Sequence, residues 1–394
     1  MRAAARSAVA VACCGGINGA ATFAVLIPAV VYLLTLPRPA PRWRILAWWV
    51  PAVIAATWWW SVPLVLLSRY GVSILPYTES AAVTTSVTGL SDVLRGTENW
   101  ISYLLVNGQP WWRVGYRIAT GAVPTLLTGL AAGLGLAGLL RPRLPARRFL
   151  LCLLLTGLLI ICAGHVSTLG NPLAGPVQHL INGPAAAFRN VRKFDPVIRL
   201  PVVLGLAHLL ASVRLPRPRA LLAAAAALAI GGLALPAYAG GLEVAGDFRQ
   251  IPPYWVSAAD WLNRHAGHQA VLVVPGAAFG QYLWGSPLDD VLQPLTTADW
   301  AERDLSLIGS PGNERLLDAI DQRLAAGDGS AALTTVLARM GVRYVLVRND
   351  LARTDLNGAW PARISQALAA SPGITRVAQF GAPRSEEHTS ELHH

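Results

Sequence analysis

Glu79 lies in the segment LPYTESAAVTT, directly after a long apolar stretch and at the start of a more polar one. A carboxylate close to apolar surroundings has its charged form disfavoured by desolvation, which is the usual route to a general base that works near neutral pH. The other interpretation places Glu79 in the first turn of a helix, where it complements the helix dipole. The sequence leaves both interpretations open.

The segment FRNVRKFDPVIRL (188–200) carries three basic residues at positions i, i+3 and i+4, namely Arg189, Arg192 and Lys193. On a helix these positions share one face. A lipid phosphate fits such a face, because Arg supplies bidentate donors and Lys a point charge. The segment therefore predicts a phosphate-binding surface.

Two further residues near this segment can ionise or exchange a proton. Asp195 precedes Pro196, which favours a helix N-cap with proline at the first helical position over a catalytic carboxylate. His165 lies near the end of an apolar stretch, where ionisable residues are functional candidates by default, although a His bonded to a neighbouring carbonyl is as common. Both are kept as accessory candidates. Asp92 and Glu98, close to Arg95, are interpreted as surface ion pairs.

The composition indicates a membrane protein rather than a soluble one. The chain has 394 residues, of which 54% are hydrophobic and 13% charged. Residues 1–240 have a net charge of +16 and residues 241–394 a net charge of −5. A nucleic-acid partner is not favoured, because the Arg residues of the first half gather at the ends of apolar stretches and not along one face.

A spanning helix needs about 20 apolar residues, and six stretches approximately qualify: Ser7 to Leu36, Ile45 to Leu67, Ile118 to Leu140, Phe149 to Leu169, Pro196 to Val213 and Ala220 to Ala239. The fifth is short and contains a proline, so it is the least secure. Three short connectors at 37–44, 141–148 and 214–219 hold ten Arg and no acid, which places them in the cytoplasm. The loops 68–117 and 170–195 then lie on the outer face, and short helices are expected in the first of them.

After Gly240 the pattern changes to alternating helix and strand signals. Helices are predicted in WVSAADWLNRH, NERLLDAIDQRLAAG and SAALTTVLARMG, and strands in AVLVVPG, VRYVLVRND and ITRVAQFG. The predicted fold is a mainly α membrane bundle (1–240) followed by a small extracytoplasmic α/β domain (241–381). Residues 382–394 break the composition abruptly and are expected to be a non-native tail.

Several long segments resemble the AftD-type α-(1→3)-arabinofuranosyltransferases of mycobacteria and related actinobacteria. The likeness rests on ACCGGIN (12–18), YTESAAVTTSVTGLSDVLRGTENW (77–100), residues 163–210 with the block FRNVRKFDPV, LIGSPGNERLLDAIDQRLA and LARMGVRYVLVRNDL. It extends over nearly the whole chain to about Gly381, and FRNVRKFDPV is its most specific part. Members are much longer, so this chain is expected to be an internal portion of such a protein.

The resemblance implies a GT-C glycosyltransferase of the inner (plasma) membrane that acts in cell wall biogenesis. Such enzymes take arabinofuranose from a decaprenyl-phosphate donor and extend the arabinan of arabinogalactan and lipoarabinomannan at the outer face. In such an enzyme we expect Glu79 to be the base or the acceptor-orienting group. We expect Arg189, Arg192 and Lys193 to hold the lipid phosphate, with His165 and Asp195 as accessories. The expected partners are the donor lipid, the arabinan acceptor and membrane lipids; a divalent cation is compatible with this chemistry, but no motif specifies a cofactor.

Two other classes of function remain as alternatives. A non-catalytic polyprenyl-phosphate or polysaccharide transporter can use the same basic face, but it predicts inverted repeats that the sequence does not show. A structural membrane scaffold whose exterior domain docks partners is the third possibility.

Overall fold

The structure is a computed structural model of the whole chain, and it describes residues 2–14, 18–37, 41–70, 78–106, 109–213, 216–238, 242, 246–304, 310–353, 358–381 and 390–393. The chain divides into two compact units. Unit 1 comprises Met1–Arg69 and Leu75–Val244, and unit 2 comprises Tyr70–Ile74 and Ala245–His394. Each unit is described separately.

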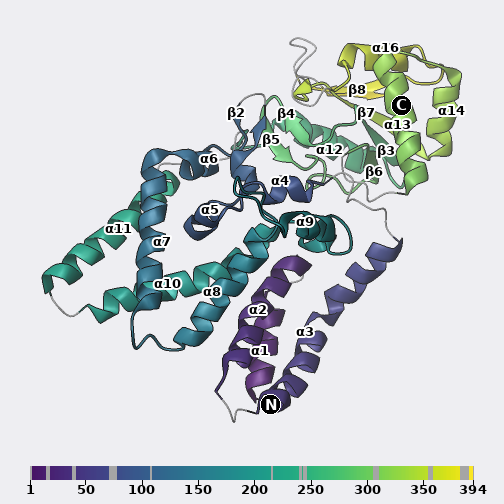
Figure 1. Cartoon of the computed structure of the whole chain (residues 1–394). Helices are drawn as coiled ribbons and strands as arrows, with labels where there is room; N and C mark the ends of the chain where they lie inside the picture. The colour runs from purple at the N-terminus through teal and green to yellow at the C-terminus, as the bar shows by residue number, and fades with distance from the viewer. Residues whose placement is uncertain are drawn as a thin grey trace. The chain divides into compact units, whose positions relative to one another are not determined.

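Unit 1 begins with the helices α1 (Arg2–Ala12), α2 (Gly19–Thr35) and α3 (Arg42–Tyr70) (Figure 1). The single span predicted from Ser7 to Leu36 is therefore wrong, because two helices occupy it. Asn18 starts the second helix: its side-chain oxygen accepts a hydrogen bond from the Ala21 backbone N–H at 3.1 Å. An Asn that caps a helix in this way satisfies one of the donors that have no partner inside the helix.

Four more long helices complete unit 1: α7 (Ala122–Leu140), α8 (Arg147–Cys162), α10 (Asp195–Ser212) and α11 (Pro216–Tyr238). Helix α10 packs against α7 and α8, and α11 packs against α7 (Figure 1). The α7–α10 contact is close because glycines face each other: a Cβ atom added to Gly138 would lie 1.8 Å from the carbonyl oxygen of Gly205. Small residues at a helix interface let the two backbones approach in this way.

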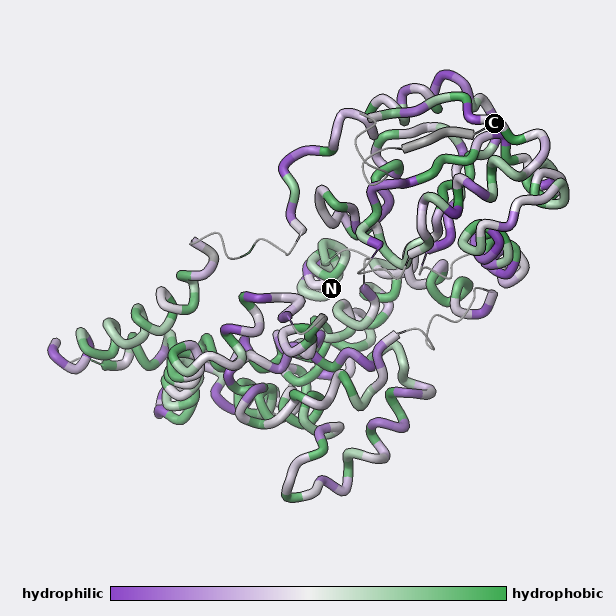
Figure 2. Tube along the Cα trace, turned by 90° about the horizontal axis from the view of Figure 1, so that it is seen from above, coloured by the Kyte–Doolittle hydropathy of each residue, from purple (hydrophilic) through white to green (hydrophobic). Residues whose placement is uncertain are grey.

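Four of the described helices are long and apolar enough to cross a membrane: Arg42–Tyr70, Ala122–Leu140, Val191–Ser212 and Pro216–Pro236. The predicted count of six is not reached, since α2 is shorter and α8 has only 16 residues. The span judged least secure in the sequence is the one with the largest buried share of the four, 39%. Its proline, Pro201, lies inside α10 and is buried. Figure 2 shows how hydrophobic these helices are along most of their length.

The segments between the long helices fold into short elements, as the sequence predicted for the first loop. The first loop contains α4 (Ala81–Thr85), α5 (Leu90–Arg95), the 3-10 helix η2 (Trp100–Tyr103), the strand pair β1 (Leu105–Val106) and β2 (Gln109–Pro110), and α6 (Arg113–Thr120). The second contains α9 (Ala174–Asn182) and the 3-10 helices η3 (Ala186–Phe188) and η4 (Val191–Phe194). Because α4 contacts α9 and η4, the two segments form one structure, which we call the loop layer (78–121 and 163–195).

Unit 2 contains a five-stranded sheet of order β6-β3-β7-β9-β8. Its strands are β3 (Ala270–Val274), β6 (Trp300–Glu302), β7 (Val342–Arg348), β8 (Arg376–Phe380) and β9 (Ser390–His393). Strand β3 pairs in parallel with β6 and β7, and β9 is antiparallel to β7 and β8. Of the predicted tail, residues 382–389 lie outside the described residues, and the backbone of Ser390–His393 forms β9.

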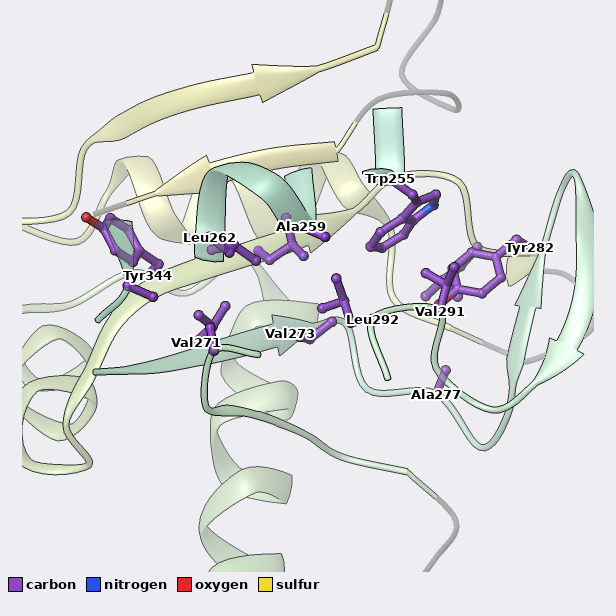
Figure 3. Packing of buried hydrophobic residues seen from close by; sticks show 14 residues of the cluster. Trp255, Ala259, Leu262, Val271, Val273, Ala277, Tyr282, Val291, Leu292 and Tyr344 are labelled. Atoms are coloured by element: carbon purple, nitrogen blue, oxygen red, sulfur yellow. The ribbon is translucent and has the colours of Figure 1, made fainter. Parts of the chain in front are cut away.

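Helices pack on both faces of this sheet. They are α12 (Pro253–His265), α13 (Pro311–Ala326), α14 (Ala331–Arg339) and α16 (Pro361–Ala369). Figure 3 shows Trp255, Ala259 and Leu262 of α12 next to Val271 and Val273 of β3, in one buried cluster. The alternate strand residues, such as Leu272 and Val345, pack with α13, α14 and α16. This alternation is typical of a sheet with two buried faces. The predicted strands and helices of this region are present, and the hairpin of β4 (Gly280–Tyr282) and β5 (Gly285–Leu288) is an addition.

Candidate functional site

Glu79 lies in the loop layer, two residues before α4. Its residue is half-buried, and within the described part of the chain its carboxylate makes no hydrogen bond or ion pair. The next residue, Ser80, is the N-cap of α4 but makes no side-chain capping bond. Instead, the first backbone N–H of this helix, that of Ala81, donates to Asn182 Oδ1 at 2.8 Å. The carboxylate of Glu79 is therefore available to a bound molecule.

Arg189 fixes the position of the Glu79 segment. Its Nη1 donates to the Glu79 carbonyl oxygen at 2.9 Å and to Thr78 Oγ1 at 3.0 Å. Its Nε and Nη2 donate to the carbonyl oxygens of Ile181 and Asn182. The residue is only 7% exposed. The expectation that Arg189 holds a phosphate does not agree with this environment, because protein carbonyl and hydroxyl oxygens occupy its guanidinium.

The basic segment is not a continuous helix, so the expected shared face of Arg189, Arg192 and Lys193 is wrong. Residues 186–188 and 191–194 form separate 3-10 turns, and Asn190 between them has φ −80° and ψ 79°, outside the helical region. Arg192 is exposed and Lys193 half-buried. Neither forms an ion pair with any described residue, so these two cations remain available for an anion.

The accessory candidates have structural partners. His165 is half-buried, and its Nδ1 lies 3.0 Å from the Thr85 carbonyl oxygen, which is the ordinary arrangement of a His bonded to a neighbouring carbonyl. Asp195 is the first residue of α10 and not its N-cap, so the capping interpretation is wrong. Its Oδ1 instead accepts from Arg199 Nε at 2.8 Å, one turn further along.

The two remaining carboxylates of the loop layer differ from each other. Asp92 pairs with Arg95 at 3.4 Å and is partly exposed, as predicted for a surface ion pair. Glu98 is 1% exposed, and its Oε2 has no hydrogen-bond partner among the described residues. The interpretation of Glu98 as a surface residue is therefore wrong. No sequence signal distinguished the two, because both lie in polar segments next to the same Arg95.

The surroundings of Glu98 favour its neutral form. Burial raises the pKa of its carboxyl group to about 7, and the charge of the nearby Asp195 raises this pKa further. The Arg199 guanidinium opposes the shift but does not cancel it. A carboxyl group beside another carboxylate is expected to keep its proton in this way.

The loop layer thus brings together groups for two kinds of chemistry. Arg192 and Lys193 form an accessible cationic pair, which suits a phosphate, and Glu79 offers an unpaired carboxylate, which suits proton acceptance from a hydroxyl. In the part of the chain that the structure describes, no three His, Cys, Asp or Glu residues are grouped closely enough to hold a metal ion. The GLGLAGLL segment lies inside α7, in agreement with the rejection of a dinucleotide-binding loop.

These features define a class of protein: a helical membrane protein with spanning helices and a folded loop layer that carries its ionisable residues. The whole chain, residues 1–394, matches the model of the family described as α-(1→3)-arabinofuranosyltransferase, N-terminal GT-C domain. The chain belongs to this family.

Two similar proteins support this assignment. An α-(1→3)-arabinofuranosyltransferase of Mycobacterium tuberculosis (strain ATCC 25618 / H37Rv) is 40% identical over 403 residues. One of Mycolicibacterium smegmatis (strain ATCC 700084 / mc(2)155) is 37% identical over 398 residues. In both comparisons the alignment covers 96% of this chain and 28% of the relative, so the chain spans little more than a quarter of their length.

The fold is also similar to solved structures of the arabinofuranosyltransferase AftD from mycobacteria, determined by cryo-electron microscopy. One of them matches with a TM-score of 0.74 and 31% sequence identity, over 100% of this chain and 27% of that chain. A structure of its R1389S mutant matches with a TM-score of 0.72.

Proposed function

We propose that this protein takes part in transferring arabinofuranose from a decaprenyl-phosphate donor to cell-wall arabinan at the outer face of the inner membrane. The names of its relatives and its family support the sugar and the reaction class. The apolar helices of unit 1 support a place in the membrane. In this proposal the loop layer and the sheet-containing unit 2 lie on the extracytoplasmic side.

The cationic pair Arg192 and Lys193 is assigned to the donor phosphate. During transfer the bond between the anomeric carbon and the phosphate oxygen breaks, so negative charge grows on the leaving polyprenyl phosphate. Cations placed at that oxygen stabilise the charge as it develops. Arg189 does not belong to this pair; it holds the Glu79 segment in place through the bonds described above.

Glu79 is assigned to the acceptor. Its carboxylate accepts the proton of the incoming arabinan hydroxyl, while the oxygen of that hydroxyl forms a new bond to the anomeric carbon. The observation that carries the proposal is the contact between Arg189 Nη1 and the Glu79 carbonyl oxygen. Because Arg189 lies three residues before Arg192 in the chain, this contact brings the proposed base and the proposed phosphate-binding pair into the same loop layer.

Arabinosyl transfer to an arabinan oligosaccharide tests the proposal, with membranes from cells that produce the protein or the full-length Mycobacterium tuberculosis relative with the matching changes. Glu79→Gln should lower the turnover number about a hundredfold, within the usual contribution of a general base. Arg192→Gln combined with Lys193→Gln should raise the KM for the donor. Arg113→Gln is the matched control, since Arg113 is exposed on α6 in the same loop layer. Unchanged transfer in Glu79→Gln contradicts the assignment of the base, and an unchanged donor KM in the double variant contradicts that of the phosphate-binding pair.

A further inference from the structure

A second ionic group lies directly behind the cationic pair. Arg199 of α10 donates from Nη1 to the Leu94 carbonyl oxygen at 2.8 Å and from Nη2 to the Val93 carbonyl oxygen, both near the end of α5. Its Nε donates to Asp195 Oδ1 at 2.8 Å. One guanidinium therefore ties the first turn of α10 to the end of α5.

Asp195 connects this group to the cationic pair through the backbone. Its N–H donates to the Arg192 carbonyl oxygen and closes the 3-10 turn that carries Arg192 and Lys193. A movement of Asp195 is therefore passed directly to both cations. Its side chain also matters electrostatically: an Asp195 carboxylate that is not engaged elsewhere can neutralise the cations next to it.

Glu98 supplies the remaining contact of Asp195. The two carboxyl groups are close enough to interact by charge and by a hydrogen bond. Glu98 is 1% exposed, so it does not contact a substrate, and its second oxygen has no partner among the described residues. A buried acid of this kind is stable next to a carboxylate only when one proton is shared between them.

We propose that Glu98 is a positioning residue for the phosphate-binding pair: it donates a hydrogen bond to Asp195 and thereby keeps Asp195 engaged with Arg199 and away from Arg192 and Lys193. The inference rests on the proposed function, because it assumes that Arg192 and Lys193 bind the donor phosphate. It adds a residue that the sequence gave no reason to select.

The proposal implies that anion binding depends on pH. The charged and titratable groups that face Glu98 are Asp195, Arg199, Tyr103 and Cys162. When Glu98 loses its proton, two carboxylates compete for one Arg199, and a negative charge is added close to Arg192 and Lys193. Binding of an anion to the pair should therefore weaken as the pH rises through about 7, where the pKa of Glu98 lies.

The test uses the purified chain in nanodiscs of neutral phosphatidylcholine and a farnesyl methyl phosphodiester as the probe. A phosphodiester keeps one negative charge from pH 6 to 8.5, so the probe does not titrate. The dissociation constant of the wild type should rise about threefold to tenfold over this range, as expected for one added charge at short distance in a partly screened site. Glu98→Gln, which keeps a donor and cannot ionise, should bind at pH 8.5 as tightly as the wild type does at pH 6.

Two variants separate positioning from stability and from nonspecific effects. Glu98→Ala removes the donor as well as the charge, and it should bind more weakly than Glu98→Gln at both pH values. Asp260→Asn changes an exposed carboxylate of α12 in unit 2 and should retain the wild-type pH dependence. A merely structural role of Glu98 does not alter the slope of binding against pH in a folded Glu98→Gln protein.

The outcomes distinguish this inference from the function on which it rests. If the wild type binds the probe through Arg192 and Lys193 but Glu98→Gln shows the same pH dependence, the inference about Glu98 is wrong and the proposed function stands. If the wild type does not bind the probe at either pH, or if Arg192→Gln with Lys193→Gln binds it normally, both are wrong.

Discussion

Nη1 of Arg189 lies 2.9 Å from the backbone carbonyl oxygen of Glu79, although 110 residues separate the two in the sequence. A second bond runs between the same segments: Thr84 Oγ1 donates to the carbonyl oxygen of Arg189 at 2.8 Å. The two long loops of unit 1 are thus bound to each other through one buried cation. The position of Glu79 therefore depends on a residue in the other loop.

Arg189→Ala should destabilise the loop layer by about 2 to 4 kcal/mol, because it leaves several buried carbonyl oxygens without donors. Thermal unfolding of the purified protein in detergent micelles measures the effect. Arg192→Ala is the matched control: Arg192 is exposed, and a change there should alter the stability by less than about 0.5 kcal/mol. Equal stabilities of the two variants would show that the contacts of Arg189 are not important.

Glu98 should make the stability of unit 1 depend on pH. Its folded pKa, about 7, lies above the ordinary value of 4.5, so the folded state holds this proton more tightly than the unfolded state does. The resulting stabilisation is fully present below pH 4.5 and is lost as the pH rises through about 7. From pH 4.5 to 8 the loss amounts to about 3 kcal/mol.

Unfolding temperatures between pH 5 and 8 check this sign. The wild type should become less stable over this range, relative to Glu98→Gln, which cannot ionise at this position. Glu98→Gln should consequently exceed the wild type in stability at pH 8. A wild type and a Glu98→Gln variant with parallel pH profiles would show that Glu98 is already ionised at pH 5.

The physical reason why the sequence misled about this site is the local backbone. The spacing of Arg189, Arg192 and Lys193 predicts one face only if the helix is continuous, and the break at Asn190 separates the buried Arg189 from the exposed Arg192. The burial of Glu98 depends on α10, which is far away in the sequence. Periodicity within a segment reports neither of these facts.

The elements themselves were easier to predict than their partners. The strands at 270–274 and 342–348 are continuous apolar runs, and the helices of unit 2 carry clear start and stop signals. In the membrane half, apolar length located the helices but missed the start of α2 at Asn18, because hydropathy alone does not detect a cap inside a long apolar stretch.

The close contact between α7 and α10 predicts a sharp difference between two glycines of one helix. A Cβ atom at Gly138 would lie 1.8 Å from the Gly205 carbonyl oxygen, and since that atom belongs to the backbone, the helices must separate. Gly138→Ala should cost at least about 2 kcal/mol. Gly133→Ala should change the stability by less than about 1 kcal/mol, because no atom lies within 4 Å of its added Cβ. Similar losses in both variants, measured by thermal unfolding, would contradict this account of the packing.

In unit 2, Arg348 forms the most deeply buried ionic contact of the described residues. Its side chain has no exposed surface, and its Nη1 lies 2.7 Å from Asp290 Oδ2 and 2.9 Å from Glu302 Oε2. The three residues cannot all carry full charges without an unbalanced buried charge. Burial raises the pKa of Glu302 to about 9, against the attraction of Arg348, so Glu302 is neutral at pH 7 and Arg348 balances Asp290.

This distribution of charge predicts unequal effects of two substitutions. Arg348→Met leaves the Asp290 carboxylate buried without its cation and should cost about 3 to 5 kcal/mol. Glu302→Gln replaces a neutral acid with a neutral amide of similar shape and should cost less than about 1 kcal/mol at pH 7. Hydrogen exchange of the β3, β6 and β7 amides in the intact protein measures both changes in unit 2 itself. Equal acceleration of exchange in the two variants would mean that Glu302 is ionised and that the charge assignment is wrong.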